Sequence, residues 1–217
     1  MRLLATSLLV GLLGITLTQC GSSANGPAPL CDTTCLKDTI RFRGDHVSNP
    51  EVALAPTNCQ ADTVLWTYEG MGVNRKIGLK SIMGQLVPIQ PSHARCVFDG
   101  NKKAWLFFND CATGRGYQVK LPYDKKKSIS VRSSGINSID PKFDIDPDML
   151  AYTDRGNIYV EHLKKGTSAM MTFKELVPID YDHIHDHIDS VKIRPNKIWV
   201  RIKIQDQWKE LEKNIDL

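Results

Sequence analysis

The sequence lacks the short motifs that mark the commonest enzyme sites. It has no Gly-x-Ser-x-Gly nucleophile elbow, no glycine-rich phosphate loop and no dinucleotide-binding fingerprint. It also has no Cys-x-x-Cys pair, which argues against redox and zinc sites built on that spacing. We therefore expect no catalytic residues of these familiar types.

Strong charge and long apolar runs are also missing from the body of the chain. The net charge is +4 over 217 residues, and the lysine clusters lie beside expected turns, where lysines are usually solvated. We therefore expect no nucleic-acid partner. No stretch after residue 20 is apolar for long enough to cross a membrane, so we expect a soluble body.

The one long apolar run lies at the start of the chain. Arg2 provides a positive charge, residues 3–17 are uncharged and mostly apolar, and small residues follow Cys20. Residues 1–20 resemble a bacterial lipoprotein signal, which implies lipidation of Cys20 and membrane contact through the lipid anchor alone. Ordinary secretion with cleavage nearby is the alternative. The resemblance predicts an address in the bacterial cell envelope, as an outer-membrane lipoprotein facing the periplasm or the cell surface.

A short segment with two cysteines follows the signal. Residues 21–37 begin with small residues, proline and glycine, which predicts a flexible tether. Disulfides are expected in an oxidising compartment, and an odd number of cysteines leaves at least one unpaired within the chain. The candidates are Cys31, Cys35, Cys59, Cys96 and Cys111. Spacing alone leaves their connectivity open.

Four similar units make up the rest of the chain. An apolar residue opens each unit, at Val52, Val97, Phe143 and Val191, so the period is about 45–48 residues. Several short strands in a period of about 40–50 residues are typical of a propeller blade. We predict that residues 38–217 form an all-β, propeller-like array of about four antiparallel blades with three to four strands each. An incomplete ring or a two-sheet β structure is the alternative.

The third unit carries the clearest pattern. Residues 140–167 read DPKFDIDPDMLAYTDRGNIYVEHLKKGT, with three apolar runs separated by an Asp-Pro-Asp turn and an Asp-Arg-Gly-Asn turn. This stretch resembles a TolB-type, WD-repeat-like β-propeller repeat. The resemblance implies a propeller fold in a bacterial lipoprotein and, by fold analogy, contact with proteins in the periplasm.

One N-terminal strand belongs to none of the four units. Residues 39–43 alternate polar and apolar side chains, as a half-buried strand does. In many propellers an N-terminal strand completes the last blade, so that no sheet edge with unpaired backbone groups remains. We predict that Ile40 and Phe42 pair with the last repeat, within residues 197–212.

Loops at one rim of such an array are the expected binding surface, because rigid sheets hold variable loops there. We expect these loops to contact a protein, a peptide or a glycan of the envelope. The residues predicted to take part are Asp110, Arg115, Asp154, Arg155, Tyr181, Asp182 and Asp186.

The most unusual segment is residues 180–189, in which His183, His185 and His187 alternate with other residues. In an extended strand the three imidazoles would share one face, and imidazole is the commonest metal ligand. They would lie about 7 Å apart, so a bend or a second segment is needed to close a metal site. The alternative is a solvated, acidic link between blades.

Two functional hypotheses follow. The first is a lipid-anchored binding or scaffold module that needs no cofactor. The second is a metal-binding protein or metal-dependent hydrolase, in which His183, His185 and His187 hold zinc, copper or nickel.

Overall fold

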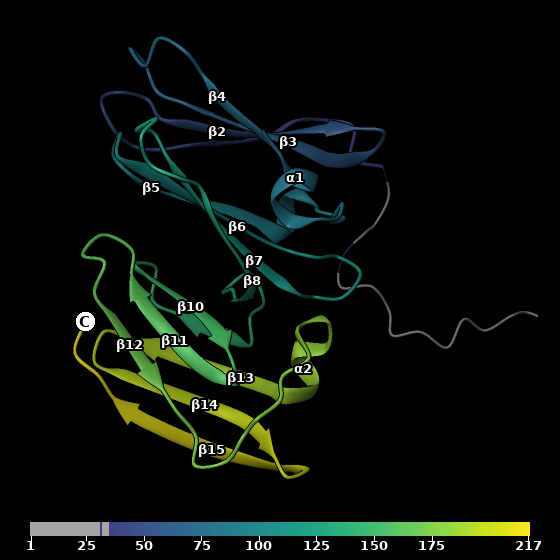
Figure 1. The fold of residues 1–217 in the computed structure, drawn as a ribbon, viewed down its shortest axis with the longest axis vertical. Coiled ribbons are helices and arrows are strands. Elements are labelled where there is room, and N and C mark those ends of the chain that lie inside the picture. The colour runs from purple at the N-terminus through teal and green to yellow at the C-terminus, as the bar shows by residue number, and fades with distance from the viewer. Residues whose placement is uncertain (1–30, 32–34) are drawn as a thin grey trace, which may run out of the picture.

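The computed structural model describes residue 31 and residues 35–217. The predictions for the signal segment, for Cys20 and for most of the tether lie outside the described residues. Strands dominate the described part of the chain, and four short helices connect them (Figure 1). The predicted all-β class, with antiparallel sheets, is confirmed. No helix in this part is both long enough and apolar enough to cross a membrane.

The first sheet contains β1–β4, each strand antiparallel to the next. Its strands are β1 (Ile40–Arg43), β2 (Glu51–Thr57), β3 (Gln60–Thr67) and β4 (Arg75–Gly78). Ile40 pairs with Leu54 and Phe42 pairs with Val52, so the prediction that these residues complete the last repeat is wrong. Residues 44–50 alone connect β1 to β2, and so short a connection makes the local hairpin cheaper in chain entropy than a pairing with the far end of the chain.

The central sheet has seven strands in the order β12-β11-β10-β8-β7-β6-β5. Its strands are β5 (Ala94–Asp99), β6 (Lys103–Asn109), β7 (Gly116–Pro122), β8 (Ser130–Ile136), β10 (Met149–Asp154), β11 (Asn157–His162) and β12 (Ser168–Met171). Helices α1 (Leu79–Met83) and η1 (Pro91–His93) lie in the connection from the first sheet. Strands β8 and β10 join the two halves of the sheet through only two residue pairs.

The third sheet has the order β15-β14-β13-β9. Its strands are β9 (Phe143–Ile145), β13 (Ile188–Arg194), β14 (Lys197–Ile204) and β15 (Gln207–Asn214). Helices η2 (Tyr181–His183) and α2 (Ile184–His187) precede β13. Strand β9 is parallel to β13, and the other pairings are antiparallel.

The predicted array of four blades is replaced by sheets of four, seven and four strands, and the described residues form no closed propeller. Phe143 and Val191 were expected at matching places in successive blades, but they pair directly within one sheet. The reason lies in the strands around them. Strand β9 is only three residues long, and β8, which continues the meander from β7, takes the place beside β10.

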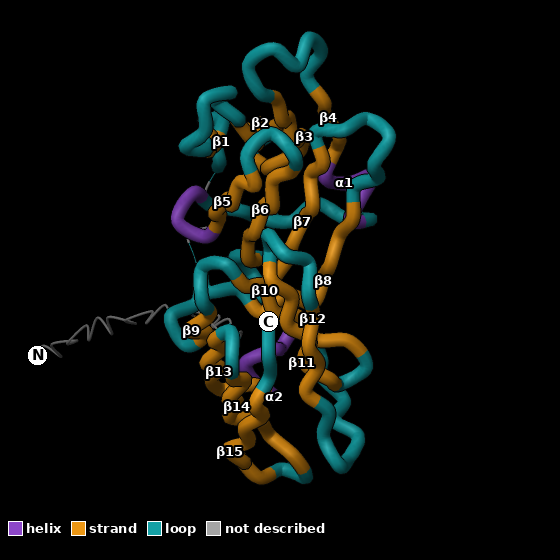
Figure 2. The backbone as a smooth tube through the Cα atoms, turned by 90° about the vertical axis from the view of Figure 1, so that its left-hand side faces the viewer, coloured by secondary structure: helices purple, strands orange, loops and turns teal. Residues whose placement is uncertain are grey.

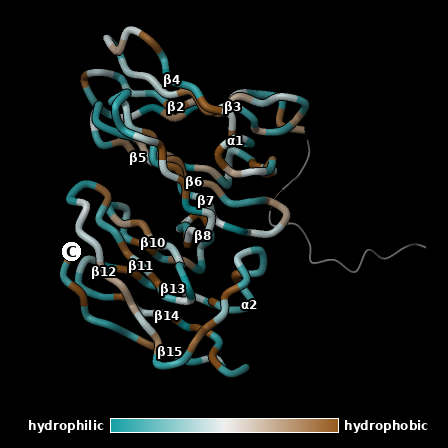
Figure 3. The backbone as a smooth tube through the Cα atoms, viewed as in Figure 1, coloured by the Kyte–Doolittle hydropathy of each residue, from teal (hydrophilic) through white to brown (hydrophobic). Residues whose placement is uncertain are grey.

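A core in the N-terminal lobe (β1–β8) fills the space between the first sheet and one face of β5–β8. Val52, Leu54 and Trp66 from the first sheet belong to the same buried cluster as Leu106 and Phe108 from β6. In Figure 3 brown, hydrophobic stretches alternate with teal, hydrophilic ones along this lobe. Removing such side chains from water stabilises a sandwich by about 25 cal/mol per Å² of apolar surface.

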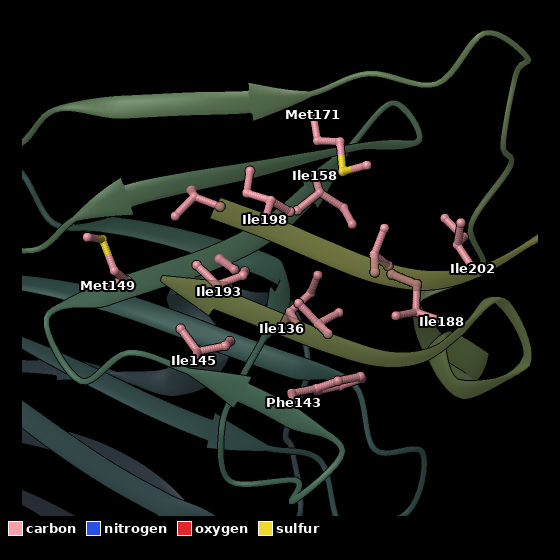
Figure 4. Close-up of a cluster of buried hydrophobic side chains, with 14 of the residues drawn as sticks. Ile136, Phe143, Ile145, Met149, Ile158, Met171, Ile188, Ile193, Ile198 and Ile202 are labelled. Atoms are coloured by element: carbon pink, nitrogen blue, oxygen red, sulfur yellow. The ribbon is translucent and has the colours of Figure 1, made fainter. Parts of the chain in front are cut away.

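A second core lies in the C-terminal lobe (β9–β15), between the third sheet and the same face of β10–β12. Figure 4 shows Ile158 of β11 and Ile198 of β14 side by side in this core. Figure 2 shows the N-terminal strands gathered at one end of the molecule and β9–β15 at the other. The central sheet is therefore the element that the two lobes share.

Buried polar side chains hold the lobes together where β8 meets β10. Gln118 Nε2 donates to Asn137 Oδ1 at 3.0 Å and to the Ala151 carbonyl at 2.7 Å. Asn137 Nδ2 lies 2.9 Å from Asn109 Oδ1. Gly116 is needed nearby, because a Cβ there would overlap the carbonyl oxygen of a residue on β8. The junction thus depends on hydrogen bonds and close backbone approach rather than on a long strand ladder.

Two disulfides attach the N-terminal segment to this framework. Cys31 is bonded to Cys111 and Cys35 is bonded to Cys59, with Cα–Cα distances of 4.8 Å and 4.3 Å. Cys96 is the remaining candidate and is a free thiol. Burial raises its pKa, so the thiol stays protonated and unreactive near neutral pH.

Candidate functional site

The turn between β6 and β7 positions the first residues of the predicted binding surface. The backbone N–H of Asp110 donates to the Arg115 carbonyl at 2.9 Å. Asp110 Oδ1 accepts from the backbone N–H of Ala112 at 2.8 Å, and its side chain is buried. The hydrogen bonds of Asp110 therefore stay within the turn, whereas the side chain of Arg115 contacts other segments of the chain.

Arg115 is the centre of a compact cluster. Its Nη1 donates to Asp182 Oδ1 at 2.9 Å, and its Nε donates to the Ser133 carbonyl at 2.7 Å. The guanidinium lies 5.5 Å from the ring of Tyr117 and 5.6 Å from the ring of Tyr181. These contacts join residues that are 67 positions apart in the chain. We call Arg115, Tyr117, Tyr181 and Asp182 the Arg115 cluster.

The cluster has a buried side and a solvent side. Tyr117 is buried, and this burial is the main cause of its raised pKa, although a hydrogen bond from Gln85 and the charge of Arg115 oppose the rise. The phenol is therefore neutral at physiological pH. Half of the Asp182 side chain is exposed, compared with 20% of the Arg115 side chain. The outer edge of the cluster can therefore meet a partner while its inner edge is fixed.

Asp154 and Arg155 lie in the tight turn between β10 and β11. Both are exposed, and Arg155 and Gly156 have φ values of 48° and 78°, as tight hairpin turns require. A Cβ on Gly156 would overlap the backbone of Val177, so the turn is packed against the segment that follows β12. The nearby Ser134 hydroxyl donates to the Thr153 carbonyl at 2.6 Å. This hydrogen bond places the end of β10 beside β8, whose Ser133 carbonyl accepts from Arg115.

The extended strand in which the three histidines would share one face does not form, because the segment forms η2 and α2 before β13 begins at Ile188. Asp180 caps η2 by accepting the Asp182 backbone N–H at 3.0 Å. Ile184 in α2 and Ile188 at the start of β13 are both buried. Both belong to the core of the C-terminal lobe, which fixes the short helix against that lobe.

The three histidines diverge as a result. His183 is exposed, and its Nδ1 lies 3.0 Å from Asp180 Oδ2. This hydrogen bond is the main cause that raises the pKa of His183 and lowers the pKa of Asp180. His185 instead turns inward, with its Nε2 3.3 Å from Asp140 Oδ2 and its ring stacked on Phe143.

The structure therefore does not bring the three histidines together. In the part of the chain that the structure covers, no group of three or more His, Cys, Asp or Glu side chains is arranged to hold a metal ion. Asp186 is exposed on α2 and His187 is half-buried at its end. The segment presents single polar side chains to solvent and does not form a ligand shell.

Sequence reasoning found Arg115, Tyr181 and Asp182, and the structure brings these three together. It missed Tyr117, although the run Arg115-Gly116-Tyr117 places an aromatic ring two residues along the strand. The contact between His185 and Asp140 was not predicted either, because no spacing in the sequence indicates it.

Comparison with known proteins identifies no family. The chain matches no protein-family model, and no curated protein matches it. Inferences about function therefore rest on the contacts described above and on the N-terminal pattern.

Proposed function

We propose that this chain is a lipid-anchored binding or scaffold module of the bacterial cell envelope, which contacts a protein, peptide or glycan partner through the loops around the Arg115 cluster. The observation that carries the proposal is the convergence of Arg115, Tyr181 and Asp182 at a surface fixed by the central sheet. Tyrosine and arginine are enriched at the energetic centres of protein interfaces. A rigid frame also lowers the entropy cost of ordering such side chains on binding.

The envelope address is part of the same proposal. The two disulfides support it, because such bonds persist in oxidising compartments and are rare in the cytoplasm. The lipoprotein-like pattern that ends at Cys20 supports an anchor on the outer membrane, facing the periplasm or the cell surface.

The proposal is tested by affinity capture from a solubilised envelope extract with the chain from residue 21 onward. The Arg115→Gln variant removes the charge that orients Asp182, and Tyr181→Ala removes the outer ring. A matched control is Arg43→Gln, because Arg43 is an exposed arginine with one carboxylate partner, Glu51. We expect the native chain and the control to enrich the same partner, and both cluster variants to lose it. Equal capture by all four proteins would reject the proposal.

A further inference from the structure

The central sheet has a second face, opposite to the one that contacts the other two sheets. On β6, Leu106 and Phe108 point into the N-terminal core, so Trp105 and Phe107 point to this second face. Trp105 and Phe107 form a small buried cluster with Leu150 of β10 and Leu163. All members of the cluster come from the central sheet and its connections, so neither of the other sheets covers this face.

Basic side chains lie over the aromatic rings of this face. Strand register places Arg95, Phe107, Gln118 and Arg132 in one row across β5, β6, β7 and β8. The cation–aromatic contacts are Arg95 over Phe107 at 4.5 Å, Arg132 over Trp105 at 5.4 Å and over Tyr152 at 4.0 Å, and Lys120 over Trp105 at 5.7 Å. The rings of Trp105 and Phe107 stack with their centroids 6.2 Å apart. The guanidinium groups of Arg95 and Arg132 therefore lie over one continuous aromatic surface. We call these rings and the basic side chains over them the platform.

Three N–H donors of this platform have no acceptor in the part of the chain that the structure describes. They are Arg95 Nε, Trp105 Nε1 and Arg132 Nη1, each buried and without a hydrogen-bond partner among the described residues. Trp105 itself is 2% exposed. The acceptor Gln118 Oε1, in the same row, also has no partner within the described chain. Native proteins leave few buried polar atoms unpaired, because each such atom loses its hydrogen bonds to water.

The charges of the platform do not balance. Glu161 neutralises Arg132 through a contact of 2.6 Å. Neither Arg95 nor Lys120 has a carboxylate within ion-pair distance in the residues that the structure describes. Arg95 is half-buried, burial lowers its pKa, and its Nε is buried with no hydrogen-bond partner among the described residues. A charge in such surroundings is normally paired.

We propose that this platform binds an oxyanion group, such as a carboxylate, sulfate or phosphate, which accepts the N–H groups of Arg95, Trp105 and Arg132. Gln118 Oε1 accepts from a hydroxyl or protonated oxygen of the same ligand. Planar guanidinium donors suit oxyanions in particular, because their N–H groups match the oxygen spacing. The site is separate from the Arg115 cluster, since Tyr117 belongs to the core on the opposite face. It does not depend on the proposed function.

The experiment follows the indole N–H resonance of Trp105 by NMR while sodium sulfate, phosphate or acetate is added. Sodium chloride at matched ionic strength is the reference. We expect a saturable shift with at least one oxyanion and none with chloride. A response limited to acetate identifies a carboxylate as the ligand group, and a response limited to sulfate or phosphate identifies a tetrahedral group. If none of the three oxyanions gives a saturable shift, the proposal is wrong.

Variants assign the binding to the named donors, with isothermal titration calorimetry as readout, because it does not depend on the indole of Trp105. Trp105→Phe keeps an aromatic ring and removes one donor. Arg95→Gln removes donor and charge, and Arg95→Lys keeps the charge without the Nε donor, which covers the case in which the glutamine variant does not fold. Each is expected to bind about tenfold to a hundredfold more weakly, the cost of losing a hydrogen bond to a charged group. The control Arg43→Gln should bind like the native chain. Unchanged affinity in both Trp105→Phe and Arg95→Lys would overturn the assignment.

Discussion

Replacing Asn137 with alanine should loosen the junction between the two lobes. The Asn137 side chain is buried and accepts from Gln118 Nε2 at 3.0 Å. Its own Nδ2 donates to Asn109 Oδ1 at 2.9 Å and lies 3.2 Å from the carbonyl oxygens of Phe108 and Tyr117. The substitution therefore leaves groups on β6 and β7 without a partner at the point where β8 meets β10.

The expected loss follows from the number of groups left unpaired. Asn109 Oδ1 loses its donor, and Gln118 keeps only its bond to the Ala151 carbonyl. A buried polar group left without a partner costs about 1–3 kcal/mol, and a lost hydrogen bond whose group keeps another partner costs about 1 kcal/mol. The substitution therefore predicts a loss of about 2–4 kcal/mol. A chain of this size changes Tm by about 2–4 °C per kcal/mol, so the variant should melt about 4–16 °C below the native chain.

Calorimetry of the oxidised chain measures this loss. Asn74→Ala is the matched control, because Asn74 is exposed and makes no side-chain hydrogen bond to the described residues. We expect the control to melt within about 2 °C of the native chain, as surface substitutions usually do. If Asn137→Ala melts as close to the native chain as Asn74→Ala does, the polar junction does not hold the lobes together.

Three further predictions test separate features. Gly116→Ala should destabilise strongly, because its Cβ would overlap a β8 carbonyl, whereas Gly78→Ala, at an open position, should not; thermal melting compares the two. Replacing Cys35 and Cys59 with serine should lower the free energy of unfolding in urea by about 3 kcal/mol, because their disulfide joins residues with a sequence separation of 24. Asp180→Asn should lower the pKa of His183 toward its ordinary value of 6.5 in an NMR titration. Pairing raises the pKa of His183 and lowers the pKa of Asp180. The ion pair therefore stabilises the fold only at pH values above the pKa of Asp180 and below the pKa of His183. It is lost as the histidine deprotonates above this window or the aspartate is protonated below it, and an unchanged His183 pKa in the variant contradicts the pairing.

Strand positions could be predicted from the sequence, because alternation and turn residues are local signals. The hairpin at residues 149–162 and the strand at residues 197–204 are found where the pattern predicts them. The pairing of strands could not be predicted in the same way. Strand β8 (Ser130–Ile136) has a polar sequence that gives no strand signal, yet it takes the central place beside β10. This one missed strand replaces a blade boundary with a continuous sheet.

The candidate site was partly predictable for a related reason. Arg115 and Asp182 were assigned to loops at one rim, and the structure brings them together, with Arg115 just before β7 and Asp182 in η2. Alternation places His183, His185 and His187 on one face only in an extended strand. The segment instead forms η2 and α2, with Ile184 and Ile188 in the core of the C-terminal lobe. The spacing of these two isoleucines fits a strand and a helix equally well, so the sequence could not decide between them.

The most direct test of the account is a photo-crosslinking experiment in living cells. A photoreactive side chain at position 183, which is exposed beside Asp182, is compared with one at position 47, which is 92% exposed and far from the cluster in the sequence. The account predicts that position 183 gives a discrete crosslink to an envelope component and that Arg115→Gln abolishes it, while position 47 gives none. No crosslink from position 183, or the same crosslink from both positions, would contradict a binding surface at the Arg115 cluster.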